Sequence, residues 1–206
     1  ARETVARASS AVFAMAVTAA ASAPDIHTFT RAQLNDQFWS EGASFGDLNT
    51  DGVNDIIAGP WWWEGPSFKT RHEYYPATTT FQLKLGPMTA ITVPGFEGFL
   101  GKENKYSNNF FVFVHDFNRD KWNDILVIGF PGQDTSWFEN PKGKAGHWLR
   151  HTVFDQTNNE SPTFADLTGD GKPELVCITR GQYGYAAPDW SDPAKPWTFH
   201  AISPNN

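Results

Sequence analysis

Oxygen-bearing side chains recur in three short segments of this 206-residue chain. The segments align without gaps: FGDLNTDGVNDIIAGP (45–60), VHDFNRDKWNDILVIG (114–129) and FADLTGDGKPELVCIT (164–179). They hold nine of the 23 acidic residues, and removing nine negative charges from the net charge of −7 leaves +2. The excess acidity is therefore local, and a local cation is the partner that it predicts.

The first segment has the donor set of a calcium loop. Positions 1, 3, 5 and 9, counted from its first aspartate, are Asp47, Asn49, Asp51 and Asp55. Alternate side chains of a tight turn point inward, and the carbonyl of Val53 at position 7 adds a fifth oxygen. Five or more hard oxygens on a flexible loop suit Ca²⁺ better than Mg²⁺. Gly52 at position 6 permits the positive φ of a sharp turn.

The acidic segments have two other possible interpretations. An EF-hand needs a carboxylate at position 12, where the three segments have Ala58, Val127 and Cys177. It also needs flanking helices, whereas strands are expected here. The other alternative is an ordinary hairpin turn marked by Asp-Gly. One pattern shared by three loops favours the metal loop over the plain turn.

The elements that position these loops form a repeat. The first aspartates, Asp47, Asp116 and Asp166, are 69 and 50 residues apart. Asparagine pairs lie at the same offset before two of them, and an aromatic residue followed by a histidine recurs after all three, at His72, His151 and His200. Periods near 50 residues indicate stacked supersecondary units. We expect the repeated histidines to be structural.

Within each unit, short apolar runs are broken by Gly, Pro, Asn or Asp, which is typical of strands. Each acidic turn joins two strands into a hairpin, and a further strand carries the histidine. Four strands per unit predict an all-β fold, a β-propeller with four-stranded blades. The predicted repeats are residues 27–76, 106–155 and 156–202, with an irregular insertion loop at 77–105. A propeller needs at least four blades, so we expect about three blades of a longer chain.

The segments resemble FG-GAP repeats, also called VCBS repeats, of integrin-α-like β-propellers. Phe45-Gly46, the loop from Asp47 to Asp55 and Ala58-Gly59-Pro60 carry the resemblance. It implies up to three structural Ca²⁺ ions and a role in recognition or adhesion, commonly in exported bacterial proteins. The ligand roles that it implies in the other two loops fall on Asp116, Asn118, Asp120, Trp122 (carbonyl) and Asp124, and on Asp166, Thr168, Asp170, Lys172 (carbonyl) and Glu174. Lys121 in place of the position-6 glycine and the neutral Thr168 depart from the family pattern.

A ligand surface is predicted at the ends of the strands opposite the acidic loops. A six-residue strand is about 20 Å long, so residues flanking the first hairpin of each unit meet there. Amides, carboxylates and aromatic rings suit a carbohydrate, with an extracellular protein as the other partner. The predicted face comprises Glu41, Trp61, Asn108, Asn109, Asp134, Asn158, Asn159, Glu160, Arg180, Tyr183 and Tyr185. Trp62 and Trp137 are expected to pack between blades.

An enzymatic role is the alternative function. Some sugar-processing lyases and dehydratases are similar to this family, and such an enzyme would pair Asp134 with His115 or Glu160. A purely structural spacer is a third reading. Gly42-Ala-Ser44-Phe-Gly46 matches the serine-hydrolase elbow, but Ser44 lies in a predicted strand rather than in a strand-to-helix turn. No catalytic residue is therefore assigned.

The N-terminus predicts export. Two arginines precede the apolar run 11–20, and Ala21-Ser22-Ala23 follows as a cleavage site. Residues 1–23 are therefore expected to be a truncated secretory signal peptide ahead of a propeller at 24–206, in a secreted, periplasmic or cell-surface protein; a short amphipathic helix is the alternative. The ten-residue run is too short to span a bilayer. The acidic charge argues against nucleic acid, and the single Cys177 excludes an internal disulfide.

Overall fold

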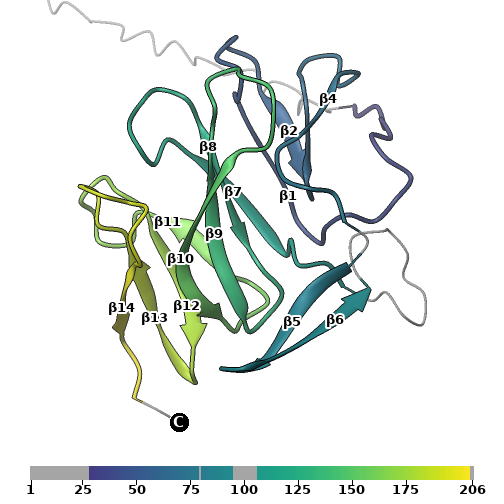
Figure 1. Ribbon diagram of the computed structural model, residues 1–206. Coiled ribbons are helices and arrows are strands. Elements are labelled where there is room, and N and C mark those ends of the chain that lie inside the picture. Colours follow the sequence, from purple (N-terminus) through teal and green to yellow (C-terminus); the bar gives the residue numbers. More distant parts are fainter. Residues whose placement is uncertain (1–27, 79, 95–105, 205–206) are drawn as a thin grey trace, which may run out of the picture. The chain divides into compact units, whose positions relative to one another are not determined.

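Every regular element in the described part of the chain is a β-strand. The computed structural model describes residues 28–78, 80–94 and 106–204, so the predicted signal peptide lies outside it. Three four-stranded antiparallel sheets have their strands in chain order, and none closes on itself (Figure 1). They consist of β1 (Ala43–Gly46), β2 (Asp55–Ala58), β3 (Trp61–Trp63) and β4 (Arg71–Glu73); of β7 (Phe111–His115), β8 (Asp124–Ile128), β9 (Gln133–Glu139) and β10 (Leu149–Thr157); and of β11 (Thr163–Ala165), β12 (Glu174–Thr179), β13 (Gln182–Ala187) and β14 (Thr198–Ala201).

These sheets confirm the predicted all-β fold with four-stranded blades. Each acidic turn joins the first two strands of a sheet into an antiparallel hairpin, as expected. Among the described residues, no helix is long and apolar enough to cross a membrane.

The repeated histidines lie on the fourth strand of each sheet. Each faces an aromatic residue of the third strand and stacks on its ring: His72 on Trp62, His151 on Trp137 and His200 on Tyr185, with centroids 4.1, 4.2 and 4.8 Å apart. In the first two sheets a glutamate also bonds the histidine Nε2, Glu64 at 2.8 Å and Glu139 at 2.9 Å. These contacts give the histidines a structural role in pairing the outer strands.

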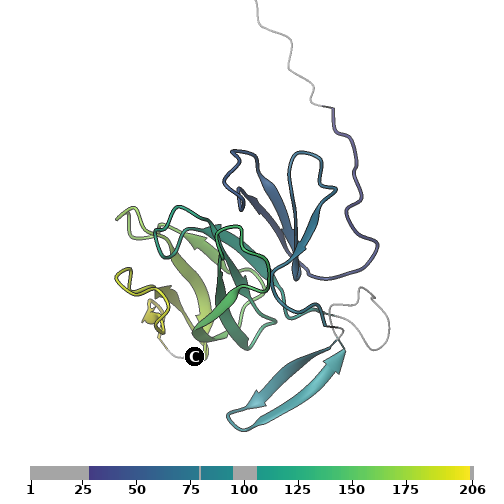
Figure 2. The ribbon, with the colours of Figure 1, turned by 45° about the horizontal axis from the view of Figure 1, so that its top comes forward.

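Strand β8 is the centre of the core because all five of its residues are buried. Successive side chains of a strand point to opposite faces. Ile125 and Val127 therefore pack with Trp62 and other residues of the first sheet, and Leu126 and Ile128 pack with residues of the third. Figure 2 shows the second sheet (green) beside the third (yellow-green). Trp62 and Trp137 belong to these two clusters, so their expected packing between blades is confirmed.

The predicted irregular loop at 77–105 is wrong for residues 80–94. They form a two-stranded hairpin of β5 (Thr80–Gly86) and β6 (Thr89–Pro94), in which Gly86 pairs with Thr89. The β-branched residues of β6 favour a strand, and the Gly and Pro that suggested irregularity mark the turn between two strands. The remaining residues of the predicted loop, 95–105, lie outside the described part.

The position of β8 gives a stability prediction. Leu126→Ala should lower the free energy of unfolding by about 2–5 kcal/mol, because the side chain is fully buried and its removal leaves a cavity. Leu149→Ala on β10, where the side chain is 62% exposed, should cost less than about 0.5 kcal/mol. Urea denaturation at 25 °C measures both. Equal losses in the two variants would contradict the assignment of β8 to the core.

Candidate metal loops and ligand pocket

The three acidic loops share one backbone shape. Position 6 has a positive φ in each, as expected: 85° at Gly52, 73° at Lys121 and 82° at Gly171. Position 4 is also left-handed, with φ of 62° at Thr50, 60° at Arg119 and 79° at Gly169. Non-glycine residues in this region cost about 1–2 kcal/mol each. The second loop, with two of them, keeps its shape because other contacts stabilise it.

The first of these contacts is made by side-chain oxygens at positions 1 and 3. In the first loop, Asp47 Oδ1 and Asn49 Oδ1 both accept the N–H of Asp51, at 3.2 and 3.1 Å. Asp47 Oδ2 accepts the N–H of Gly52 at 2.9 Å, and Asp51 Oδ1 accepts that of Val53 at 2.8 Å. The second loop repeats all four bonds from Asp116, Asn118 and Asp120, the last of these to the N–H of Trp122. The oxygens therefore converge around the amides of the loop itself.

The third loop departs from this arrangement at position 3. Asp166 accepts the N–H groups of Gly169, Asp170 and Gly171, and Asp170 accepts that of Lys172. Thr168 instead donates its hydroxyl to Glu174 Oε1 at 3.1 Å. Position 3 of this loop therefore turns toward position 9.

The carboxylate at position 9 is buried and joins distant parts of its sheet. Asp55 accepts the N–H groups of Leu48 and Gly65, at 2.8 and 2.9 Å. Asp124 accepts those of Phe117 and Asn140, at 2.9 and 2.8 Å. Neither aspartate has any exposed surface. Burial is the main cause that raises the pKa of Asp55, and it raises that of Asp124 to about 7, with smaller contributions from the neighbouring loop aspartates.

The strand register explains why position 9 of the third loop is a glutamate. Position 10 of each loop pairs with a residue of the third strand: Trp63, Phe138 and Ala186. Two residues after these partners come Gly65 and Asn140 in the first two sheets, but Pro188 in the third. Proline has no N–H to donate. The longer Glu174 side chain accepts instead from the N–H of Leu167 at 2.9 Å and from Thr168.

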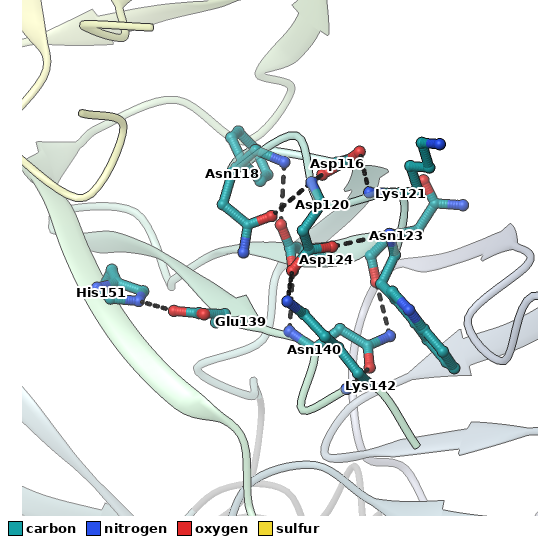
Figure 3. Close-up of polar contacts among 12 residues, drawn as sticks. Asp116, Asn118, Asp120, Lys121, Asn123, Asp124, Glu139, Asn140, Lys142 and His151 are labelled. Carbon is teal, nitrogen blue, oxygen red and sulfur yellow. Dashed lines mark hydrogen bonds and ion pairs between the residues drawn. The ribbon is translucent and has the colours of Figure 1, made fainter. Parts of the chain in front are cut away.

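Asn123, just before β8, and Asn140, just after β9, tie the first loop to the second. Figure 3 shows the two asparagines and the bond between them. Asn123 Nδ2 donates to the carbonyl oxygen of Asp47 at 2.8 Å. Asn140 Nδ2 donates to the carbonyl oxygens of Leu48 and Asn123, at 2.8 and 2.9 Å, and only 3% of Asn140 is exposed. Neither asparagine was predicted from the sequence. Their partners lie 76 and 92 positions away, so no local pattern indicates them.

The loops differ in how well they suit a divalent cation. Among residues 28–78, 80–94 and 106–204, no three Asp, Glu, His or Cys side chains group closely enough to hold a metal ion. The first loop offers only oxygen donors, with three carboxylates and no basic residue in 45–60. In the third loop, Lys172 Nζ lies 3.8 Å from Asp170 Oδ2, and both side chains are about half exposed. The calcium ligands therefore stay a prediction, and the first loop fits that prediction best.

A polar pocket gathers two residues of the predicted ligand face. Asn108 and Asp134 line a hollow of about 440 Å³ together with Ser136, Arg150 and Thr152. Asp134 Oδ2 accepts from Arg150 Nη2 at 2.5 Å and from Ser136 Oγ at 3.0 Å. Ser136 Oγ also accepts from Arg150 Nε at 3.0 Å and lies 3.0 Å from Thr152 Oγ1. The pocket thus presents a connected set of charged groups and hydroxyls.

Asn109, expected on the same exposed face, is fully buried, so that prediction is wrong. Its Nδ2 donates to the carbonyl of Gly59 and to the hydroxyls of Tyr74 and Tyr75. Glu41 is also structural in its contacts, because both of its oxygens accept from Ser107, at 2.8 and 2.6 Å. Partial burial raises the pKa of Glu41.

Asn108 and Asn158 owe their repetition to a turn. Asn108 Oδ1 accepts the N–H of Phe130, and Asn158 Oδ1 accepts that of Arg180, each 22 residues later and at 3.0 and 2.9 Å. These bonds cap the connection between the second and third strands of their sheets.

The other predicted face residues are dispersed. Trp61 lies under the guanidinium of Arg71, whose Cζ is 3.9 Å from the ring centroid. Asn159 and Tyr183 line a separate hollow of about 210 Å³, and Glu160 is exposed. Arg180 pairs with the exposed Asp155, and Tyr185 stacks on His200.

The structure separates His115 from Asp134, one of the residue pairs that an enzyme would have used. In the strand register, His115 lies opposite Asp124, at the end of β8 next to the acidic loop. Asp134 precedes Thr135, which pairs with Ile128 at the other end of β8. His115 instead packs edge-on against Phe117 and Trp190, and burial lowers its pKa.

Repeated sheets, each with an acidic loop between its first two strands, define a β-propeller-type module. Residues 116–177 match the family model described as FG-GAP-like repeat. This match runs from the first aspartate of the second loop into β12, beyond the third loop, and it confirms the resemblance for these two loops. A search of curated proteins and a search of solved structures each found no match.

The asparagine bridge between the loops gives a second prediction. Asn140→Ala should lower the free energy of unfolding by about 2–4 kcal/mol, because it leaves the carbonyls of Leu48 and Asn123 without their donor. Asn54→Ala is the control, since Asn54 holds in the first loop the position of Asn123 but is exposed; it should change stability by less than about 0.5 kcal/mol. Chemical denaturation measures both. An Asn140→Ala variant as stable as the control would contradict the bridge.

Proposed function

We propose that this chain is an exported recognition module whose first acidic loop binds Ca²⁺ as a structural ion and whose polar pocket binds a carbohydrate. The observation that carries the proposal is the connected network of Asp134, Ser136, Arg150 and Thr152 in a pocket of about 440 Å³. That volume lies in the range of small-molecule sites. Secretion, a periplasmic place or a cell-surface place follows from the predicted signal peptide and belongs to the same proposal.

The chemistry of the pocket suits a neutral sugar. A carboxylate accepts from hydroxyl groups, a guanidinium donates to them, and the hydroxyls of Ser136 and Thr152 do both. Because Asp134 and Arg150 form an ion pair, their charges cancel, and a ligand with neither acidic nor basic groups fits best. Tyr75 and Phe138 add ring surface to the lining, against which the apolar face of a sugar can pack.

The donor set of the first loop supports the calcium part of the proposal. The oxygens of Asp47 and Asn49 already converge, and Asp51 adds a carboxylate beside them. A bound Ca²⁺ would supply the positive charge that these carboxylates lack. Since the carbonyls of Asp47 and Leu48 accept from the second sheet, an ordered first loop would stabilise the contact between the sheets.

Calcium should raise the melting temperature of the full chain. Extracellular calcium modules bind at about 10⁻⁴ to 10⁻³ M, so 5 mM Ca²⁺ should add about 1–2.5 kcal/mol per site and several degrees to the Tm. Mg²⁺ at 5 mM should not. Asp47→Asn should reduce the calcium effect, whereas Asp36→Asn, an exposed aspartate outside the loops, should leave it intact. A melt that is indifferent to calcium, or unchanged by Asp47→Asn, would contradict calcium binding at the first loop.

Sugar binding should depend on Asp134. The full chain is screened on an array of immobilised glycans, and the best neutral oligosaccharide is titrated by calorimetry. Asp134→Asn should weaken its binding tenfold or more, which is about 1.4 kcal/mol, because the carboxylate accepts from sugar hydroxyls. Asp155→Asn is the matched control, since it removes the carboxylate of an arginine pair at the open surface. No binding to any glycan, or equal loss in both variants, would reject the pocket as a sugar site.

A further inference from the structure

We propose that the ammonium group of Lys142 is the built-in cation of the second acidic loop, so that this loop is ordered without calcium. The inference rests on the proposed function in one respect: it contrasts the second loop, which needs no calcium, with the first loop, which is proposed to bind it. The three loops have one backbone shape and the same acidic positions, but the second has a cation in place. Lys142 Nζ lies 3.1 Å from Asp120 Oδ2.

The second loop needs a cation because one of its carboxylate oxygens is buried. Asp120 Oδ1 accepts the N–H of Trp122, but Asp120 Oδ2 has no hydrogen bond of standard geometry from any described residue. A buried carboxylate oxygen without compensation is costly. The ammonium of Lys142 is close enough to form an ion pair with it, although the angles fall outside those of a hydrogen bond.

The chain directs Lys142 toward this oxygen. The N–H of Lys142 donates to Asn140 Oδ1 at 2.9 Å, and Lys142 takes a positive φ of 59°. Asn140 is itself fixed by its bonds to Asp124, Leu48 and Asn123. Figure 3 shows the side chain extending from this turn toward the loop. The lysine therefore reaches the loop from a turn that buried groups hold in place.

The corresponding positions of the other sheets lack a cation. The N–H of Gly65 donates to position 9 of the first loop as the N–H of Asn140 does to position 9 of the second. The residue two positions after Gly65 is Ser67, and the residue two positions after Asn140 is Lys142. The register places Trp190 there in the third sheet. The sequence of the loops themselves differs in the same sense. Segment 45–60 has three carboxylates and no basic residue, whereas segment 114–129 has Arg119 and Lys121 beside its three aspartates, and Lys142 adds a cation at Asp120.

Lys142→Met should create a calcium site in the second loop. The substitution keeps most of the aliphatic length but removes the charge, and calorimetry should find one additional Ca²⁺ per chain. Trp122 occupies position 7 and can sensitise the luminescence of Tb³⁺ bound beside it. Lys142→Met should therefore show Tb³⁺ emission that the wild type lacks. Adding Trp122→Phe to Lys142→Met should remove this emission. Lys144→Met, an exposed lysine two residues along, is the control and should behave as the wild type.

A stability cycle in EDTA tests the ion pair without calcium. Lys142→Met should lower the Tm by about 2–4 °C, and adding Asp120→Asn should recover most of that loss. No recovery would overturn the pairing. If the wild type binds calcium at the first loop but Lys142→Met gains no site, or if Trp122→Phe abolishes terbium emission in the wild type, this inference is wrong and the proposed function stands. If no variant responds to calcium, the proposed calcium site of the first loop and the calcium site created by Lys142→Met are both wrong. The stability comparison in EDTA still tests the Lys142–Asp120 ion pair.

Discussion

A buried carboxylate at the ninth position of the first two acidic loops is the interaction on which their sheets depend. Asp55 and Asp124 each accept one N–H from the start of the loop and one from beyond the third strand. A single side chain thus fixes the loop, the hairpin and the strand that follows. Without it, two buried amides would lose their acceptor, at a cost of about 1–3 kcal/mol each. Asp55 and Asp124 therefore stabilise their sheets whether or not the loop binds a metal.

The part of the fold that the sequence predicted is the part encoded by local spacing. The acidic turn, the apolar runs beside it and the later histidine recur at a fixed period, so the hairpins and the four-stranded sheets could be inferred. The contacts of Asn123 and Asn140 could not, because they depend on how two sheets pack rather than on any spacing within one. The hairpin of β5 and β6 was missed for another reason. Glycine and proline occur both in irregular loops and in tight turns, and only the β-branched residues of β6 distinguish the two.

Adjacent asparagines show why residue type alone did not define the ligand face. Asn108 lines the polar pocket, while Asn109 points inward and donates to a backbone carbonyl and two tyrosine hydroxyls. Both residues precede β7, and Asn108 lies in a bend, so strand alternation does not determine their directions. The sequence placed both at the correct end of the sheet. The inward direction of Asn109 depends on Tyr74 and Tyr75, which follow β4 of another sheet.

The charges around the loops divide their roles although their backbones are alike. The second loop contains Arg119 and Lys121 and pairs Asp120 with Lys142, whereas segment 45–60 has three carboxylates and no basic residue. Asn140 connects the two, because it orients Lys142 through its Oδ1 and bonds the carbonyl of Leu48 through its Nδ2. A cation that belongs to the chain thus holds one side of the contact between the sheets. That side can form as soon as the chain folds, and a calcium ion arriving later at the first loop would meet a backbone that is already positioned.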